Sequence, residues 1–141
     1  VIGEVAHLPA DVRAPLDAAL ARTRTNAGLR LTLALSYGSR RELVHAARQL
    51  AAAVQRGTLT PEDIDEQALG AHLYTHDLPD PDILIRTSGE QRLSNFLLWQ
   101  LAYTELFFTP TLWPDFTREE LVAIIGAFQQ RERRFGAVDP A

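Results

Sequence analysis

The stretch PDILIRTSGEQRLSNFLLWQLAYTELFFTPTLWPDF, residues 81–116, decides the fold class of this 141-residue chain. It opens with an apolar run at residues 83–85 that predicts a buried strand ending at Arg86. A polar loop containing Gly89 follows, and a second short strand is predicted at residues 105–108. Open α/β sheets bind ligands at the carboxyl ends of their strands, so Arg86 and the loop after it are the first candidates for a site.

Working outward, the rest of the chain alternates between strand and helix patterns. The predicted class is therefore α/β, with a mostly parallel central sheet flanked by helices. Start signals of the capping-box or proline type stand at Ser39, Thr60 and Thr117. The predicted strands are residues 1–3, 29–35, 83–85 and 105–108, and the predicted helices are 10–25, 39–56, 66–73, 95–102 and 118–133.

Composition narrows the function classes. Hydrophobic residues make up 46% of the chain and the net charge is −4, so a globular core is expected and a nucleic-acid partner is not. Cysteine is absent, which excludes disulfides and thiolate chemistry in this sequence. No apolar run is long enough to span a membrane, and a cytoplasmic location is expected. The chain starts at Val1 without methionine, as if within a strand already begun, so we expect the sheet to be incomplete at the N-terminus.

Arg86, Arg92 and Ser94 form the first candidate site. Two guanidinium groups and a hydroxyl around a glycine-containing loop could hold a phosphate or diphosphate, because forked donors match phosphate oxygens. The alternative is that Arg86 forms a structural ion pair with Glu90 while Arg92 is solvated.

Glu105 is the second candidate because it stands inside an apolar and aromatic run. A carboxylate in such surroundings is costly unless it is paired or metal-bound. It could bind magnesium near the two arginines, or it could be the structural partner of another arginine. Asp115, after Trp113 and Pro114, could be a site residue but is more typical of a turn.

Three further features allow two interpretations each. His72 and His76 lie four residues apart, as on one helix face, but no other ligand type clusters with them. The basic run 131–136 could be a solvated helix end or a second phosphate contact across a dimer. The aromatic side chains could line a lipid tunnel, or form a core and a subunit interface, which we favour; they are Phe96, Trp99, Tyr103, Phe107, Phe108 and Trp113.

The run RTSGEQRLSNF, residues 86–96, resembles the signature of the cis-prenyltransferases, the family of undecaprenyl diphosphate synthase. The resemblance continues through LLWQ at 97–100, YTEL at 103–106 and LWPDF at 112–116. It also includes SYG at 36–38 and RERRFG at 131–136, and so covers nearly the whole chain.

The resemblance implies a transferase that condenses isopentenyl diphosphate with an allylic prenyl diphosphate, using Mg²⁺. It also implies a homodimer, the fold class already expected, and peripheral membrane contact through a lipid product. Glu105 matches a magnesium-site acid close to the partner's site in the family dimer, and Arg134 and Gly136 match an element that reaches the neighbouring subunit. The positions that match isopentenyl diphosphate contacts are Arg86, Arg92, Leu93 and Ser94, and Asp115 matches a further acid of the family.

Some residues depart from the family pattern. Gln91 stands where some members have histidine, and Ser36 where many have asparagine. The family's catalytic aspartate lies in an Asp-Gly-Asn motif, which this sequence lacks. Residues 1–141 are therefore expected to be the C-terminal portion of a single isoprenyl transferase domain. A non-catalytic subunit is the alternative, but such partners tend to lose the phosphate arginines, and this chain keeps them.

Overall fold

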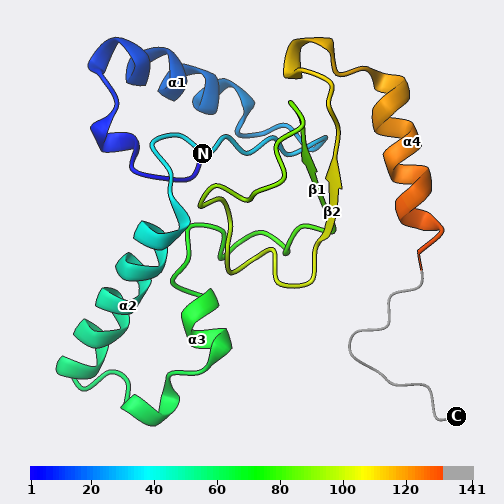
Figure 1. Ribbon diagram of the computed structural model, residues 1–141. Coiled ribbons are helices and arrows are strands. Elements are labelled where there is room, and N and C mark those ends of the chain that lie inside the picture. The colour runs from blue at the N-terminus through cyan, green and yellow to red at the C-terminus, as the bar shows by residue number, and fades with distance from the viewer. Residues whose placement is uncertain (132–141) are drawn as a thin grey trace, which may run out of the picture. The chain divides into compact units, whose positions relative to one another are not determined.

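The structure, a computed structural model, describes residues 1–131. The chain forms two compact units, one covering Val1–Pro79 and the other beginning at Asp80. Helices and a parallel strand pair are both present, so the predicted α/β class is confirmed (Figure 1). None of the helices within residues 1–131 has the length and apolar character needed to cross a bilayer.

The first unit is built around helix α2, Ser39–Gln55, which packs against the short helix α3, Glu66–Gly70 (Figure 1). The buried positions of α2 recur every three or four residues, which places them on one face. They are Ser39, Glu42, Ala46, Leu50 and Ala53. The unit also contains α1, Ala10–Thr23, and single 3-10 turns at Val5–His7 and Pro61–Asp63.

Two predictions for this unit are corrected by the structure. Helix α2 does begin at Ser39, but Gly38 is its N-cap and Glu42 is fully buried, so the predicted capping box at Ser39 is wrong. Residues 1–3 and 29–35 form no strand beyond one isolated parallel bridge between Ile2 and Ala34. A strand needs a hydrogen-bonded neighbour along its length, and residues 1–79 supply only this single bridge.

The second unit contains a parallel pair of strands, β1 (Ile83–Arg86) and β2 (Glu105–Phe108), as predicted. In their register Ile83 lies opposite Glu105, and Arg86 lies opposite Phe108. A 3-10 turn, Trp113–Asp115, and helix α4, Arg118–Gln129, follow. The predicted capping box is confirmed, because the Thr117 hydroxyl accepts from the Glu120 amide and the Glu120 carboxylate accepts from the Thr117 amide.

The helix predicted for residues 95–102 is wrong. This segment forms a series of turns, in which Ser94, Asn95 and Leu97 have φ values of 49°, 62° and 45°. These are left-handed conformations, which a right-handed helix cannot contain. Helix α4 also ends earlier than predicted, at Gln129.

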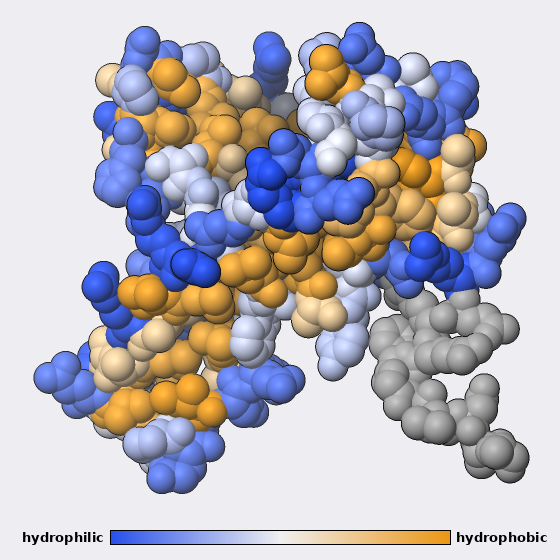
Figure 2. All heavy atoms as spheres, in the orientation of Figure 1, coloured by the Kyte–Doolittle hydropathy of each residue, from blue (hydrophilic) through white to orange (hydrophobic). Residues whose placement is uncertain are grey.

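Many large apolar side chains are exposed, as the orange areas of Figure 2 show. Leu29 is 97% exposed and Leu31 is 75% exposed, on the segment 29–35 for which the sequence predicts a strand. Tyr103 and Trp113 are also largely exposed, so these two aromatic side chains are not core residues of the second unit. Their part in a subunit interface stays a prediction.

Candidate functional site

Arg86 lies where the sequence placed it, at the last position of β1. The loop after it is fixed by backbone hydrogen bonds: the Ser88 amide donates to the Thr111 carbonyl and the Gly89 amide to the Thr109 carbonyl, both at 2.8 Å. Gly89 has a φ of 70°, which suits glycine in this turn. Arg86 is half-buried, and no acidic side chain within residues 1–131 forms an ion pair with it. A half-buried guanidinium without a protein anion is suited to binding an anionic ligand.

Arg92 lies six residues further on and is exposed, with its guanidinium paired to Glu90. The alternative pairing of Glu90 with Arg86 is wrong, because Glu90 pairs with Arg92 and none of the ion pairs within residues 1–131 involves Arg86. Leu93 is half-buried, and Ser94 is exposed in a left-handed turn. The convergence of Arg86 and Arg92 on one anion stays a prediction.

Glu105 begins β2 and is only 26% exposed. Its carboxylate forms an ion pair with Arg131 at 3.0 Å, which agrees with the interpretation that it is the partner of an arginine. In the parallel register, Glu105 and Arg86 lie at opposite ends of the strand pair, about 10 Å apart along the strands. The sequence suggests a position for Glu105 near the two arginines. The fold of one chain instead places Glu105 away from Arg86.

Asp115 closes the 3-10 turn Trp113–Asp115 and is exposed, which agrees with its interpretation as a turn residue. The turn is held by stacking of the Trp113 and Phe116 rings, whose centroids are 6.2 Å apart. Arg134 and Gly136 lie outside the described residues.

The acidic and histidine side chains of residues 1–131 bear on whether a metal ion could bind. Within residues 1–131 there is no group of three or more His, Cys, Asp or Glu side chains placed to do so. Magnesium does not require such a group, because it commonly takes one or two carboxylates and completes its shell with phosphate oxygens and water. Glu105 fits a magnesium site that is completed by phosphate oxygens and water. It does not fit a site in which protein side chains supply all of the ligands.

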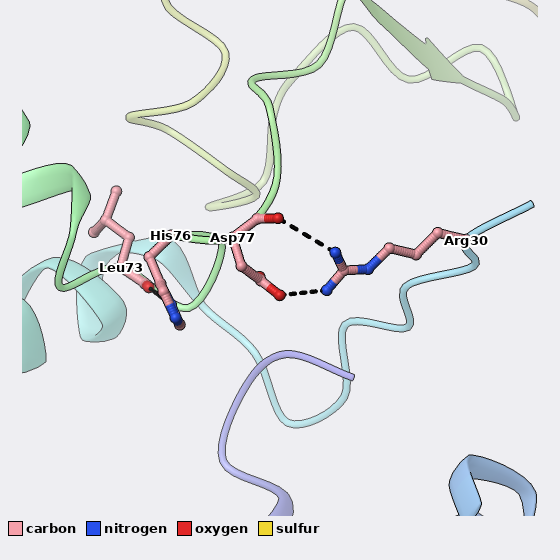
Figure 3. A network of polar contacts seen from close by, with 4 residues as sticks. All are labelled: Arg30, Leu73, His76 and Asp77. Atoms are coloured by element: carbon pink, nitrogen blue, oxygen red, sulfur yellow. Dashed lines mark hydrogen bonds and ion pairs between the residues drawn. The ribbon is translucent and has the colours of Figure 1, made fainter. Parts of the chain in front are cut away.

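The two histidines have local roles instead. The Nδ1 of His72 lies 2.8 Å from the Ala68 carbonyl oxygen, and the Nδ1 of His76 lies 3.1 Å from that of Leu73. Figure 3 shows the second contact, and beside it the Arg30 guanidinium directed at both the carbonyl and the carboxylate of Asp77. Hydrogen bonding to Arg30 lowers the pKa of Asp77 below its ordinary value. This network ties residues 30 and 77 together and presents no metal site.

A second carboxylate, Glu120, joins the segment after β2 to the start of α4. It accepts hydrogen bonds from the hydroxyls of Thr111, at 2.7 Å, and Thr109, at 3.1 Å, and from the Thr117 amide. These donors, chiefly Thr111, lower the pKa of Glu120 below its ordinary value of 4.5. The same threonines carry the carbonyls that fix the loop after Arg86, so Glu120 supports that loop indirectly.

We expect Glu120→Gln to reduce the free energy of unfolding in a pH-dependent way. A carboxylate with a lowered folded-state pKa stabilises the protein above its unfolded pKa of about 4.5, and this contribution is lost as the pH falls through the folded pKa. The difference between wild type and Glu120→Gln should be largest above pH 5 and should shrink toward pH 3, as measured by urea unfolding. A difference that does not change with pH would contradict this account.

Comparison with known proteins decides the family. The family model described as putative undecaprenyl diphosphate synthase matches residues 1–136. The chain belongs to this family. An isoprenyl transferase of Geobacillus kaustophilus is 54% identical over 138 residues, which are 98% of this chain and 54% of that protein. An isoprenyl transferase of Brucella suis is 54% identical over 99% of this chain and 55% of its own length.

Solved structures of prenyl diphosphate synthases have the same fold. A lavandulyl diphosphate synthase from Lavandula x intermedia, crystallised with dimethylallyl diphosphate, matches with a TM-score of 0.93 and 44% identity, covering 96% of this chain and 58% of that one. A probable undecaprenyl diphosphate synthase from Campylobacter jejuni matches with a TM-score of 0.80 and 37% identity, covering 96% and 61%. The chain spans about half the length of the curated isoprenyl transferases that it matches.

Two contacts of the candidate site were missed by sequence reasoning. The sequence indicates a basic run at 131–136, whereas the structure places Arg131 against Glu105, 26 residues earlier. The start signal at Thr117 predicts only a capping role for Glu120, whereas its carboxylate also accepts hydrogen bonds from two threonines before the helix. No spacing rule connects residues so far apart, but a lone acid in an apolar run does indicate that some cation must be near.

Proposed function

We propose that this chain is the C-terminal portion of a single cis-prenyltransferase domain, which condenses isopentenyl diphosphate with an allylic prenyl diphosphate. The observation that carries the proposal is the family match over residues 1–136. The half-buried Arg86, which has no acidic partner within residues 1–131, supports it.

In this proposal Arg86, Arg92, Leu93 and Ser94 bind isopentenyl diphosphate. Arg86 offers a forked set of donors from the rigid end of a strand, and the loop that follows is fixed to the segment after β2. Arg92 exchanges its exposed pairing with Glu90 for the diphosphate. The anionic end of the substrate is then held while its double bond is directed at the allylic carbon, which is an orientation effect.

Glu105 is proposed to serve a second copy of the chain. Because it lies at the other end of the strand pair from Arg86, a homodimer in which each chain lends its acid to the neighbouring site accounts for both residues. Arg134 and Gly136 are assigned to the same neighbouring site by their match to the family pattern, and Asp115 is assigned as a further acid of the family without a subunit. A bound Mg²⁺ would stabilise the negative charge that develops on the leaving diphosphate.

We expect the 141-residue chain by itself to bind isopentenyl diphosphate without turning it over. The chain has the proposed diphosphate pocket but lacks the Asp-Gly-Asn motif that the family uses in the reaction. Calorimetric titration with isopentenyl diphosphate should give saturable binding, and incubation with farnesyl diphosphate and Mg²⁺ should give no longer prenyl product. Cooperative urea unfolding of the same sample provides the control for folding.

The expected binding of isopentenyl diphosphate and the expected lack of turnover can be contradicted separately. Measured chain elongation would show that this chain does not need the missing motif. A folded chain that shows no saturable binding would contradict the assignment of the pocket to Arg86 and the loop after it.

A further inference from the structure

The Arg131 guanidinium lies against one face of β2. Along the strand, Glu105 and Phe107 are half-buried while Leu106 and Phe108 are exposed, so the first two lie on the same face. The Arg131 guanidinium contacts both of them. It forms the 3.0 Å ion pair with the Glu105 carboxylate, and its central carbon lies 5.7 Å from the centre of the Phe107 ring.

The backbone of Arg131 is also fixed, at the end of helix α4. It stands two residues after the last residue of α4, and its amide donates to the Phe128 carbonyl at 3.1 Å. A cation near the C-terminal end of a helix is favoured by the carbonyl dipoles there. The planar guanidinium of an arginine can pair with a carboxylate and stack on an aromatic ring at the same time. The ammonium group of a lysine does this less well.

The proposed metal acid is therefore already neutralised by an arginine of the same chain. A divalent cation and a guanidinium that bind the same carboxylate repel each other, and they compete for its oxygen atoms. The printed contact joins Arg131 to one of the two carboxylate oxygens, so an ion on the other oxygen meets the charge of the guanidinium, and an ion that takes both oxygens requires Arg131 to withdraw. Magnesium bound through one carboxylate depends on phosphate oxygens for much of its shell, so it would displace Arg131 more readily when a diphosphate is present.

We propose that Arg131 is a positioning residue that competes with the divalent cation for Glu105, so that cation loading depends on a bound diphosphate. This rests on the proposed function, which assigns Glu105 to the metal. Arg131 keeps the carboxylate paired and oriented in the absence of the cation. It also weakens cation binding until diphosphate oxygens compensate for the lost ion pair.

The test is a Mn²⁺ titration of the complete protein, followed by the electron paramagnetic resonance signal of free Mn²⁺, with and without inorganic pyrophosphate. Mn²⁺ takes the same oxygen ligands as Mg²⁺. We expect Arg131→Gln to bind Mn²⁺ about two- to fivefold more tightly without pyrophosphate, since an ion pair formed by a largely exposed arginine contributes little. The difference should be smaller when pyrophosphate is present. Unchanged or weaker binding by Arg131→Gln would overturn the proposal.

Arg118→Gln is the matched control. It removes the same charge from the first residue of α4, about 18 Å away along the helix, a distance at which salt screens an exposed charge. We expect its Mn²⁺ affinity to equal that of wild type. Equal tightening by both variants would assign the effect to net charge and overturn the role of Arg131.

Glu105→Gln separates this proposal from the proposed function. If Glu105→Gln binds Mn²⁺ as wild type does, the metal assignment of Glu105 fails, and the role of Arg131 fails with it. If Glu105→Gln loses binding while Arg131→Gln is unchanged, the metal assignment stands and only competition by Arg131 is overturned. In the double variant, Arg131→Gln should have no further effect, which a purely structural role would not predict.

Discussion

An Arg86→Ala variant of the intact enzyme is expected to show a KM for isopentenyl diphosphate about 10- to 100-fold higher, with little change in the KM for the allylic substrate. A hydrogen bond to a charged group is worth about 1.5–3 kcal/mol, and the forked guanidinium makes more than one such bond. Arg86 can act strongly because it stands at the end of a strand and is half-buried. Steady-state kinetics with each substrate varied in turn provides the measurement.

Arg86→Lys and Arg118→Ala complete this experiment. The lysine keeps the charge but loses the fork, so its KM for isopentenyl diphosphate should lie between those of wild type and Arg86→Ala. Arg118, exposed at the start of α4, should be replaceable without effect on either KM. Equal increases in both KM values for Arg86→Ala would argue against a pocket specific to isopentenyl diphosphate.

The sequence predicted well those elements that depend on residues close together in the chain. The apolar run before Arg86 and the run at Glu105–Phe108 are both strands, and they pair in parallel as α/β alternation requires. The Thr117 start signal worked because the reciprocal hydrogen bonds of a capping box involve only residues 117–120. The same kind of pattern failed at Ser39, because the N-cap of α2 is Gly38 and the Glu42 carboxylate accepts a hydrogen bond from the Tyr74 amide, 32 residues away.

The failures occurred where tertiary partners decide the conformation. Residues 29–35 alternate as a strand should, yet within residues 1–79 they find only the bridge at Ile2, and Leu29 and Leu31 stay exposed. The helical pattern of residues 95–102 is interrupted by left-handed residues that no propensity scale anticipates. In the candidate site, the position of Arg86 followed from the strand, whereas the pairing of Glu105 with Arg131 required the fold.

We expect Glu42→Ala to lower the free energy of unfolding by about 3 kcal/mol, a large effect for one substitution. The Glu42 side chain is 0% exposed, and its carboxylate accepts hydrogen bonds from the Tyr37 hydroxyl and, at 2.8 Å, from the Tyr74 amide. Removing it leaves these part-buried donors without this acceptor and creates a cavity beside Ser39 and Ala46 on the buried face of α2. Urea unfolding followed by circular dichroism measures the loss.

Two variants test whether the carboxylate itself is responsible. Tyr37→Phe removes one donor and retains the Tyr74 amide contact, so it should cost about 1 kcal/mol. Glu62→Ala, at an exposed position of the turn Pro61–Asp63, should change stability by no more than about 0.5 kcal/mol. A Glu42→Ala effect as small as that of Glu62→Ala would show that the buried carboxylate does not hold the start of α2 to the backbone at residue 74.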